Sequence, residues 1–341
     1  MKDIFLFTDY RGQFYSSTKH RGAAVDLPKL AEEFEKNNFN LVVKPFSKID
    51  FRVQNYKDEW VLYQTSEDPG LFYCSYIEDI VLGLSIQGAK LIPSFEYFKA
   101  HHNKHFMEIL RDTCSVSEIQ NIQAKRYGTF EDYQKDLENT QKEFFVLKSS
   151  GTSKSKGVFL LKTTKEKIGL PKLLSKTFST KNWSYFLEEL KTGKKLLPIS
   201  NYRQKFILQQ YIAGVKGDYR VVVYNDKFYV LYRENRPNDF RASGSGRFNY
   251  SVELPPGLLD YAKKVFSSFN APYMALDIGV KENNFYLFEF QFLSFGQYTL
   301  EKSKFFYSYN DKKWTKTFEQ PDLEREIASS VTSYINRNSQ K

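Results

Sequence analysis

The sequence has few cysteines, and they form no motif. Cys74 and Cys114 are the only two among 341 residues, and neither belongs to a Cys-x-x-Cys pair. A disulfide framework or a zinc ribbon needs more cysteines at closer spacing. We therefore expect two reduced thiols.

Long apolar runs are also missing. No stretch approaches the roughly 18 to 20 apolar residues of a membrane-spanning helix. The apolar run after Met1-Lys2-Asp3 ends at Thr8, which is too short for a signal peptide. We expect a cytoplasmic protein without a membrane partner. Its 41% hydrophobic and 17% aromatic content is typical of a globular chain with two or three subdomains.

No nucleic-acid-binding pattern accompanies the formal charge of +10. Lys and Arg are spread along the chain, and helix-turn-helix, RNA-recognition and zinc-finger motifs are absent from the sequence. Nucleic acid is therefore the less favoured partner. A basic cleft for phosphorylated small molecules explains the charge equally well.

Strands and helices alternate in the first third of the chain. Strands are expected at 4–8, 39–45, 60–64 and 90–92, with helices between them. Asp26 is the expected N-cap of the first helix, and Gly88 the expected end of the second. This alternation is typical of a small parallel α/β domain. The basic loop 10–21 follows the first strand, and it either binds an anionic substrate or is simply solvated.

Three histidines in the segment His101-His102-Asn103-Lys104-His105 allow two interpretations. They could ligate a metal, or Asn103 could cap a helix that continues through Leu110. The cap is favoured, because no carboxylate accompanies the histidines.

A glycine-rich loop, 149–157, lies between two predicted strands at 144–148 and 158–162. Its two glycines, hydroxyls and lysines supply the backbone N–H groups, donors and positive charge that a polyphosphate needs. The Walker A pattern is absent from it. A surface hairpin has the same composition, so both interpretations stay open. Residues 163–203 are expected to form an excursion with a helix around 183–190.

The second half continues with strands and a long polar segment. Strands are expected at 206–212, at 221–224 after Asp218-Tyr219-Arg220, and at 228–233. The segment 234–250 is glycine-rich and carries Arg236, Arg241 and Arg247, which favours a lid over phosphates. A helix after Pro255-Pro256-Gly257 leads to the last hairpin.

The stretch 273–292 reads as two strands that carry oxygen ligands. Alternation places Asp277 on the less apolar face of the first strand, and Glu289 and Gln291 on one face of the second with Leu287. A three-residue turn, 282–284, would set Asp277 directly opposite Glu289. Two carboxylates and an amide suit Mg²⁺. Two amphipathic strands with solvated acids are the alternative.

The order of these elements resembles the ATP-grasp superfamily, most closely the ribosomal-protein glutamate ligases and glutathione synthetases. The resemblance implies α/β and α+β architecture: an N-terminal parallel α/β domain at 1–98, a central ATP-grasp subdomain at 99–205 and a C-terminal one at 206–341. This chain departs from the family pattern at two places. It has Gln291 where the family commonly has Asn, and Ser294-Phe295-Gly296 where the family often has Pro-Gly.

The resemblance also implies site residues, which fall into three groups. Metal ligands would be Asp277, Glu289 and Gln291. Catalytic residues would be Arg220, Arg233 and Arg241. ATP-binding residues would be Lys104, Lys148, Ser150, Gly151, Thr152, Ser153, Lys156, Gly157, Gln209, Gln210, Tyr211, Ile212 and Asp218.

The activity implied is that of an ATP-dependent carboxylate–amine ligase with Mg²⁺, or Mn²⁺ in its place. A substrate carboxylate would attack the γ-phosphorus of ATP, and an amine would then attack the acyl phosphate. Small-molecule or peptide acids and amines are the expected substrates, and a homodimer is compatible with the family. An ATP-grasp phosphotransferase and an inactive nucleotide-binding protein are the alternatives.

Overall fold

We describe the protein from a computed structural model, which places residues 1–14, 25–137, 145–151, 157–177, 181–194 and 199–339. It forms two compact units. The first contains residues 1–101, 115–119 and 215–341, and the second contains 102–114 and 120–214.

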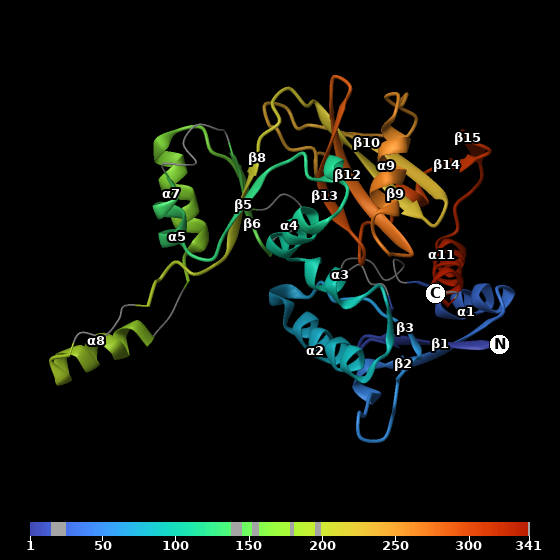
Figure 1. Ribbon diagram of the computed structural model, residues 1–341, viewed down its shortest axis with the longest axis horizontal. Coiled ribbons are helices and arrows are strands. Elements are labelled where there is room, and N and C mark those ends of the chain that lie inside the picture. Colours follow the sequence, from blue (N-terminus) through green and yellow to red (C-terminus); the bar gives the residue numbers. More distant parts are fainter. Residues whose placement is uncertain (15–24, 138–144, 152–156, 178–180, 195–198, 340–341) are drawn as a thin grey trace. The chain divides into compact units, whose positions relative to one another are not determined.

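A four-stranded parallel sheet opens the first unit, in the order β2-β1-β3-β4 (Figure 1). Asp26 caps α1 through its Oδ1, which accepts from the backbone N–H of Lys29 at 3.2 Å, and Gly88 ends α2 with a φ of 89°. The predicted parallel α/β domain and both helix boundaries are confirmed. Its elements are β1 (Lys2–Thr8), α1 (Leu27–Lys36), β2 (Phe39–Pro45), β3 (Trp60–Leu62), α2 (Phe72–Gln87), β4 (Lys90–Ile92) and α3 (Phe95–Ala100).

The second sheet of this unit has seven strands, in the order β13-β12-β9-β10-β14-β15, with β11 paired to β10. The strand pairs among its described residues are antiparallel. Its strands are β9 (Gly217–Tyr224), β10 (Lys227–Glu234), β11 (Phe248–Asn249), β12 (Tyr273–Lys281), β13 (Asn284–Gln291), β14 (Phe305–Asn310) and β15 (Lys313–Phe318). The helices α9 (Leu258–Ser267) and α10 (Tyr298–Glu301) accompany it.

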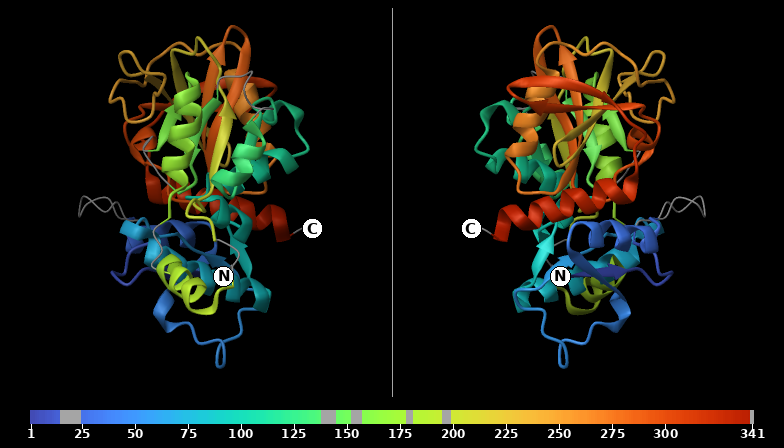
Figure 2. Two further views of the ribbon diagram at one scale, coloured as in Figure 1. Left: turned by 90° about the vertical axis from the view of Figure 1, so that its left-hand side faces the viewer. Right: turned by 90° about the vertical axis from the view of Figure 1, so that its right-hand side faces the viewer.

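The last helix, α11 (Leu323–Ser339), joins the two sheets of the first unit. Figure 2 shows it running between them. One continuous core contains apolar side chains of β1, β3, β9, β12 and α11, among them Leu6, Val222 and Val331. Because both sheets bury a face against the same core, the parallel sheet supports the strands that carry the candidate site.

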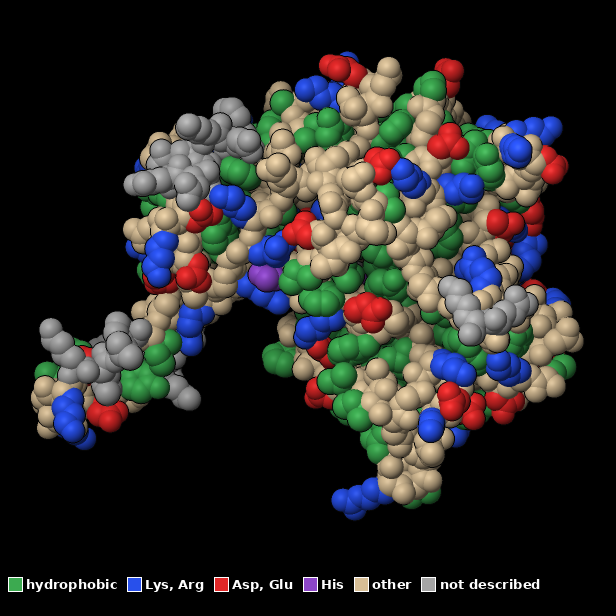
Figure 3. Space-filling model, in the orientation of Figure 1, with side chains coloured by type: hydrophobic (Ala, Val, Ile, Leu, Met, Phe, Trp, Pro, Cys, Tyr) green, Lys and Arg blue, Asp and Glu red, His purple; other side chains and the backbone are tan. Residues whose placement is uncertain are grey.

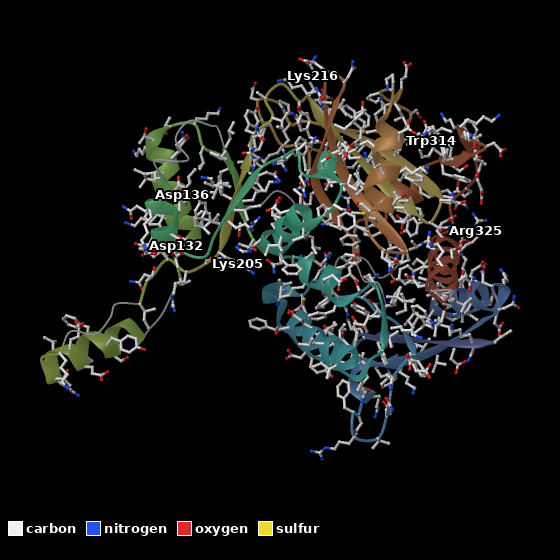
Figure 4. The ribbon with its side chains drawn as sticks, viewed as in Figure 1. Asp132, Asp136, Lys205, Lys216, Trp314 and Arg325 are labelled. Carbon is white, nitrogen blue, oxygen red and sulfur yellow. The ribbon has the colours of Figure 1, made fainter. Side chains whose placement is uncertain are left out.

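The second unit is built on a four-stranded antiparallel sheet, in the order β5-β8-β6-β7. One face packs against α5 and α7 through aromatic and aliphatic side chains. Asp136, next to α5, accepts from Lys125 Nζ at 2.9 Å and from Tyr127 Oη at 2.6 Å, which ties the helix to β5 (Figure 4). The elements are α4 (Lys104–Thr113), β5 (Ala124–Tyr127), α5 (Phe130–Lys135), β6 (Phe145–Ser149), β7 (Val158–Leu160), α7 (Thr164–Ser175), α8 (Lys181–Thr192) and β8 (Phe206–Gln210).

Charged side chains of both signs are interspersed within each unit on the face that Figure 3 shows. This agrees with the spread of Lys and Arg along the sequence. No helix among the described residues combines the length and the apolar character needed to cross a bilayer.

Candidate functional site

The predicted metal ligands lie on one face of the seven-stranded sheet. Asp277 on β12 is paired with Glu289 on β13 and with Arg220 on β9. Residues directly opposite each other in an antiparallel sheet project from the same face. The predicted opposition of Asp277 and Glu289 is therefore confirmed, and Arg220 joins them.

The turn that produces this register differs from the prediction. Lys281 pairs with Asn284, so the turn has two residues, Glu282 and Asn283, rather than three, and Glu282 has a φ of 55°. The extra residue lies further along, at a bulge in β13 where the pairing shifts between Asp277 and Ile278. The shorter turn and the bulge together still place Asp277 opposite Glu289, as predicted.

The bulge also changes which side chains share a face. Ile278 is paired with Leu287 and Leu276 with Phe290, and all four side chains are buried. Leu287 therefore lies on the core face, and its predicted place beside Glu289 is wrong. The bulged Phe288 lies over Gly279, where an added Cβ would come within 2.2 Å of its ring.

Two buried arginines hold Asp277 in place. Arg233 Nη2 lies 2.7 Å from Asp277 Oδ2, and Arg220 Nη1 donates to Asp277 Oδ1 at 3.1 Å. Arg233 also forms a two-point ion pair with Asp218, at 2.6 and 2.9 Å. Asp218 therefore orients Arg233, and Arg233 orients Asp277.

Burial and these ion pairs shift the pKa values in the cluster. The pKa of Asp218 is raised to about 6: burial is the largest cause, Arg233 opposes it and Asp277 adds to it. Burial disfavours the charge of Arg233, but Asp277 and Asp218 outweigh it and raise its pKa well above the ordinary value. At neutral pH Asp218 is thus mostly ionised and Arg233 is protonated.

The open side of the cluster is formed by Glu289 and Gln291. Gln291 Oε1 accepts from Arg220 Nη2 at 3.4 Å, and Gln291 Nε2 donates to Glu289 Oε1 at 3.4 Å. Both side chains are half-buried. Three carboxylates, including Asp218, face two guanidinium groups in this set. The oxygen donors and the one uncompensated negative charge fit a divalent cation such as Mg²⁺.

Arg241, the third predicted catalytic arginine, lies in the loop between β10 and β11. It pairs with Asp239, and the shortest distance, from Nη2 to Oδ2, is 2.6 Å. The same loop is closed by a hydrogen bond from the backbone N–H of Arg236 to the carbonyl of Arg241. Its lid role stays a prediction.

In the second unit, the predicted nucleotide residues gather on the face of the sheet opposite α5 and α7. Lys148 is paired with Ile207, and Val146 with Gln209, so Lys148 and Gln209 project from one face. Both are buried, as is Lys104 at the start of α4. The two strands predicted on either side of the glycine-rich loop are β6 and β7, which pair antiparallel.

Gln209 carries a contact that the sequence did not indicate. Its Nε2 donates to Glu108 Oε1 at 2.9 Å, and Glu108 Oε2 accepts from Arg111 Nε at 2.8 Å. Glu108 and Arg111 are 0% exposed. The Gln209 amide therefore contacts Glu108, and the adenine-binding role of this residue stays a prediction. The Glu-x-x-Arg spacing on α4 is the signal that could have found the pair.

The start of the glycine-rich loop is fixed by α4. Ser150 Oγ donates to Asn103 Oδ1 at 3.0 Å, and the Ser150 carbonyl accepts from the backbone N–H of Lys104 at 3.0 Å. Asn103 Oδ1 also accepts from the N–H of Phe106, so the predicted cap of this helix is confirmed. Gly151 follows directly, and Gly157 has a φ of 71°. Thr152, Ser153 and Lys156 lie outside the described residues.

The predicted adenine segment begins on β8 and leaves it. Gln210 is the last residue of β8, and its N–H donates to the carbonyl of Gln123 at 2.8 Å. Tyr211 and Ile212 follow the strand and are half-buried. These two residues therefore lie beyond the paired part of β8, and their adenine-binding role stays a prediction.

Comparison with solved structures supports the fold. No protein-family model matches the chain, and no curated protein matches it. Among solved structures, D-cycloserine synthetase DcsG is 11% identical with a TM-score of 0.53, covering 97% of this chain and 99% of that one. D-alanine–D-alanine ligase from Bacillus anthracis is 13% identical with a TM-score of 0.52, covering 100% and 99%. The ATP-grasp ligase PsnB, complexed with minimal precursor, Mg and ADP, is 11% identical with a TM-score of 0.53, covering 97% and 96%. Identities this low show the fold alone.

Proposed function

We propose that this chain, which has the ATP-grasp fold, is an ATP-dependent carboxylate–amine ligase that works through an acyl phosphate. The observation that carries the proposal is the opposition of Asp277 and Glu289 beside two buried arginines. Solved structures of the same fold include ligases complexed with ATP, or with ADP and Mg. The nucleotides and the Mg in those structures support ATP and Mg²⁺ as the cofactors of this chain.

Asp277, Glu289 and Gln291 would hold Mg²⁺, or Mn²⁺ in its place, which when bound would neutralise charge on the β- and γ-phosphates of ATP. Arg220 and Arg233 would stabilise the charge that develops on the transferred phosphoryl group. Because Asp218 and Asp277 hold these guanidinium groups before any ligand binds, little reorganisation would be needed during the reaction.

Residues of the second unit would bind the nucleotide. The ammonium groups of Lys104 and Lys148 would pair with phosphate oxygens or the adenine edge, and the backbone of Tyr211 and Ile212 would bond to adenine. Ser150 and Gly151 would begin the phosphate loop. A substrate carboxylate would attack the γ-phosphorus and release ADP, and an amine would then displace phosphate from the acyl phosphate.

The substrate class remains part of the proposal. Small carboxylic acids and peptides are both compatible with the fold, since one solved structure contains ADP with a leader and a core peptide. The basic loop after β1 would favour an acidic donor, although most of it lies outside the described residues.

The test is a panel of carboxylic acids with ATP and Mg²⁺, scored by ADP release, with hydroxylamine as the amine. We expect at least one acid to give ADP together with an equal amount of hydroxamate, because hydroxylamine captures an acyl phosphate. ADP with a stable phosphorylated product and no hydroxamate would favour a phosphotransferase. No ADP release with any acid would favour an inactive nucleotide-binding protein.

Glu289→Gln is the matched variant for this assay. It keeps the size of the side chain and removes one carboxylate from the cation-binding face, so we expect ADP release to fall by about 100-fold or more. Gln134→Glu, on the exposed surface of α5, is the control and should keep full activity. Equal rates in wild type and Glu289→Gln would contradict the assignment.

A further inference from the structure

A carboxylate lies beside two of the histidines in the segment 101–105. Ligand atoms of Glu67, His101 and His102, one from each side chain, all lie within 4.8 Å of one another. Glu67 is distant in the sequence, in the loop that follows β3. The histidines therefore do have an accompanying carboxylate, which the local sequence pattern did not indicate.

His101 is held at the end of α3. Its backbone N–H donates to the carbonyl groups of Tyr97 and Phe98, at 3.2 and 3.0 Å. Both of these residues are buried, and the Tyr97 ring stacks on Phe292 with centres 3.9 Å apart. His101 is itself buried, so its imidazole has little freedom to move.

His102 follows directly and has an unusual backbone conformation. The peptide bond keeps it next to His101, and its φ of 52° lies in the left-handed region. This conformation costs energy in a residue with a side chain, and such positions are frequent at ligand-binding sites. In an extended chain, successive side chains project to opposite sides. Here the two neighbouring imidazoles lie near the same carboxylate.

The loop that carries Glu67 is fixed on both sides of this residue. Ser66 is buried, and its Oγ accepts from the backbone N–H of Asp68 at 3.3 Å. The carboxylate of Asp68 accepts from the N–H groups of Tyr73 and Cys74, both at 3.1 Å. Glu67 is exposed, so its carboxylate can rotate towards the imidazoles while the backbone stays in place.

We propose that Glu67, His101 and His102 bind Zn²⁺, with water as the fourth ligand. Two imidazoles and one carboxylate are a ligand set that Zn²⁺ takes in proteins, whereas Mg²⁺ prefers oxygen ligands. Around a tetrahedral Zn²⁺ with ligand bonds of about 2.1 Å, the ligand atoms lie about 3.4 Å apart. The separations therefore need to shorten by at most about 1.4 Å, which side-chain rotation supplies.

This site shares no residue with the cation-binding face that carries Asp277 and Glu289. It does not depend on the proposed ligase activity. A bound Zn²⁺ ties the loop after β3 to the end of α3, and it stabilises the folded state by binding to it alone.

Isothermal titration calorimetry with Zn²⁺ tests the inference on the chelator-treated, full-length protein, with excess Mg²⁺ present to occupy oxygen-ligand sites. We expect the wild type to bind Zn²⁺ and to melt at a higher temperature when it is bound. Glu67→Gln should weaken Zn²⁺ binding about tenfold or more, because it removes a direct ligand. Since Glu67 is exposed, the metal-free variant should melt like the wild type. Glu35→Gln, the same change on the exposed surface of α1, should leave Zn²⁺ binding unchanged.

Two histidine variants separate the cluster from the rest of the segment. His102→Asn introduces a residue that tolerates the left-handed backbone, and it should weaken Zn²⁺ binding as much as Glu67→Gln does. His105→Gln, in α4, should keep Zn²⁺ binding, because His105 is not among the clustered residues. A wild type that binds no Zn²⁺, unchanged affinity in Glu67→Gln, or equal losses in His102→Asn and His105→Gln would overturn the inference.

Discussion

Each unit contains a buried arginine that pairs with carboxylates, and the two clusters differ in how completely they are closed. In the second unit, Glu108 is 0% exposed, and its two oxygens are bound by Arg111 and Gln209. In the first unit, Arg233 is 2% exposed and serves two aspartates, and the chain of contacts continues to half-buried Glu289. A closed pair stabilises a fold, whereas an open one offers ligands to a cation.

A glutamate-to-glutamine substitution in each cluster should show the largest difference between the two. Glu108→Gln should lower the free energy of unfolding by about 3–5 kcal/mol, because it removes the carboxylate that pairs with the buried Arg111. Glu289→Gln should change it by less than about 0.5 kcal/mol, because its surroundings are partly open to water. Urea denaturation of both variants measures the difference. Similar losses in the two would show that the clusters are energetically alike.

The bulge in β13 can be tested through the glycine beneath it. Gly279→Ala should destabilise the protein by about 1–3 kcal/mol, since the new Cβ would overlap the Phe288 ring. Thermal unfolding of Gly279→Ala measures this loss. The double variant Gly279→Ala/Phe288→Ala should regain much of it. No rescue in the double variant would mean that Phe288 does not occupy the space above Gly279.

The pH dependence of stability tests the open cluster of the first unit through Asp218. Asp218 has a pKa of about 6 in the folded protein, above the roughly 3.9 of an unfolded Asp. Between pH 4 and 6 the folded state therefore binds more protons, so Asp218 contributes stability at low pH that is lost as pH rises toward 6. Asp218→Asn should remove this part of the slope. Identical slopes of melting temperature against pH in wild type and Asp218→Asn would contradict the raised pKa.

Much of the candidate metal site could be predicted because strand alternation and residue chemistry are local. The period of two identified Asp277, Glu289 and Gln291, and the structure pairs Asp277 with Glu289. The bulge at Phe288 could not be predicted, because Leu287 and Phe288 suit the core face equally well. Its position depends on packing over Gly279, which lies on another strand.

The closed cluster shows a second reason why part of the structure could not be predicted from the sequence. Glu108 and Arg111 have the spacing of an ordinary solvent-exposed helical ion pair, and their complete burial follows from the sheet of the second unit. Gln209 was predicted to belong to the ATP-binding residues, and the local pattern gave no sign of its side-chain partner on α4, which is 101 positions away in sequence. In both cases the surroundings of the side chain depend on contacts with distant parts of the sequence and not on the local pattern.

We propose that the open cluster of the first unit binds a divalent cation together with ATP. Mn²⁺ binding, followed by electron paramagnetic resonance with a non-hydrolysable ATP analogue, tests it without any knowledge of the acid or amine. We predict saturable Mn²⁺ binding by the wild type that is weakened about tenfold or more in Glu289→Gln. Equal affinity in the two proteins would contradict the claim.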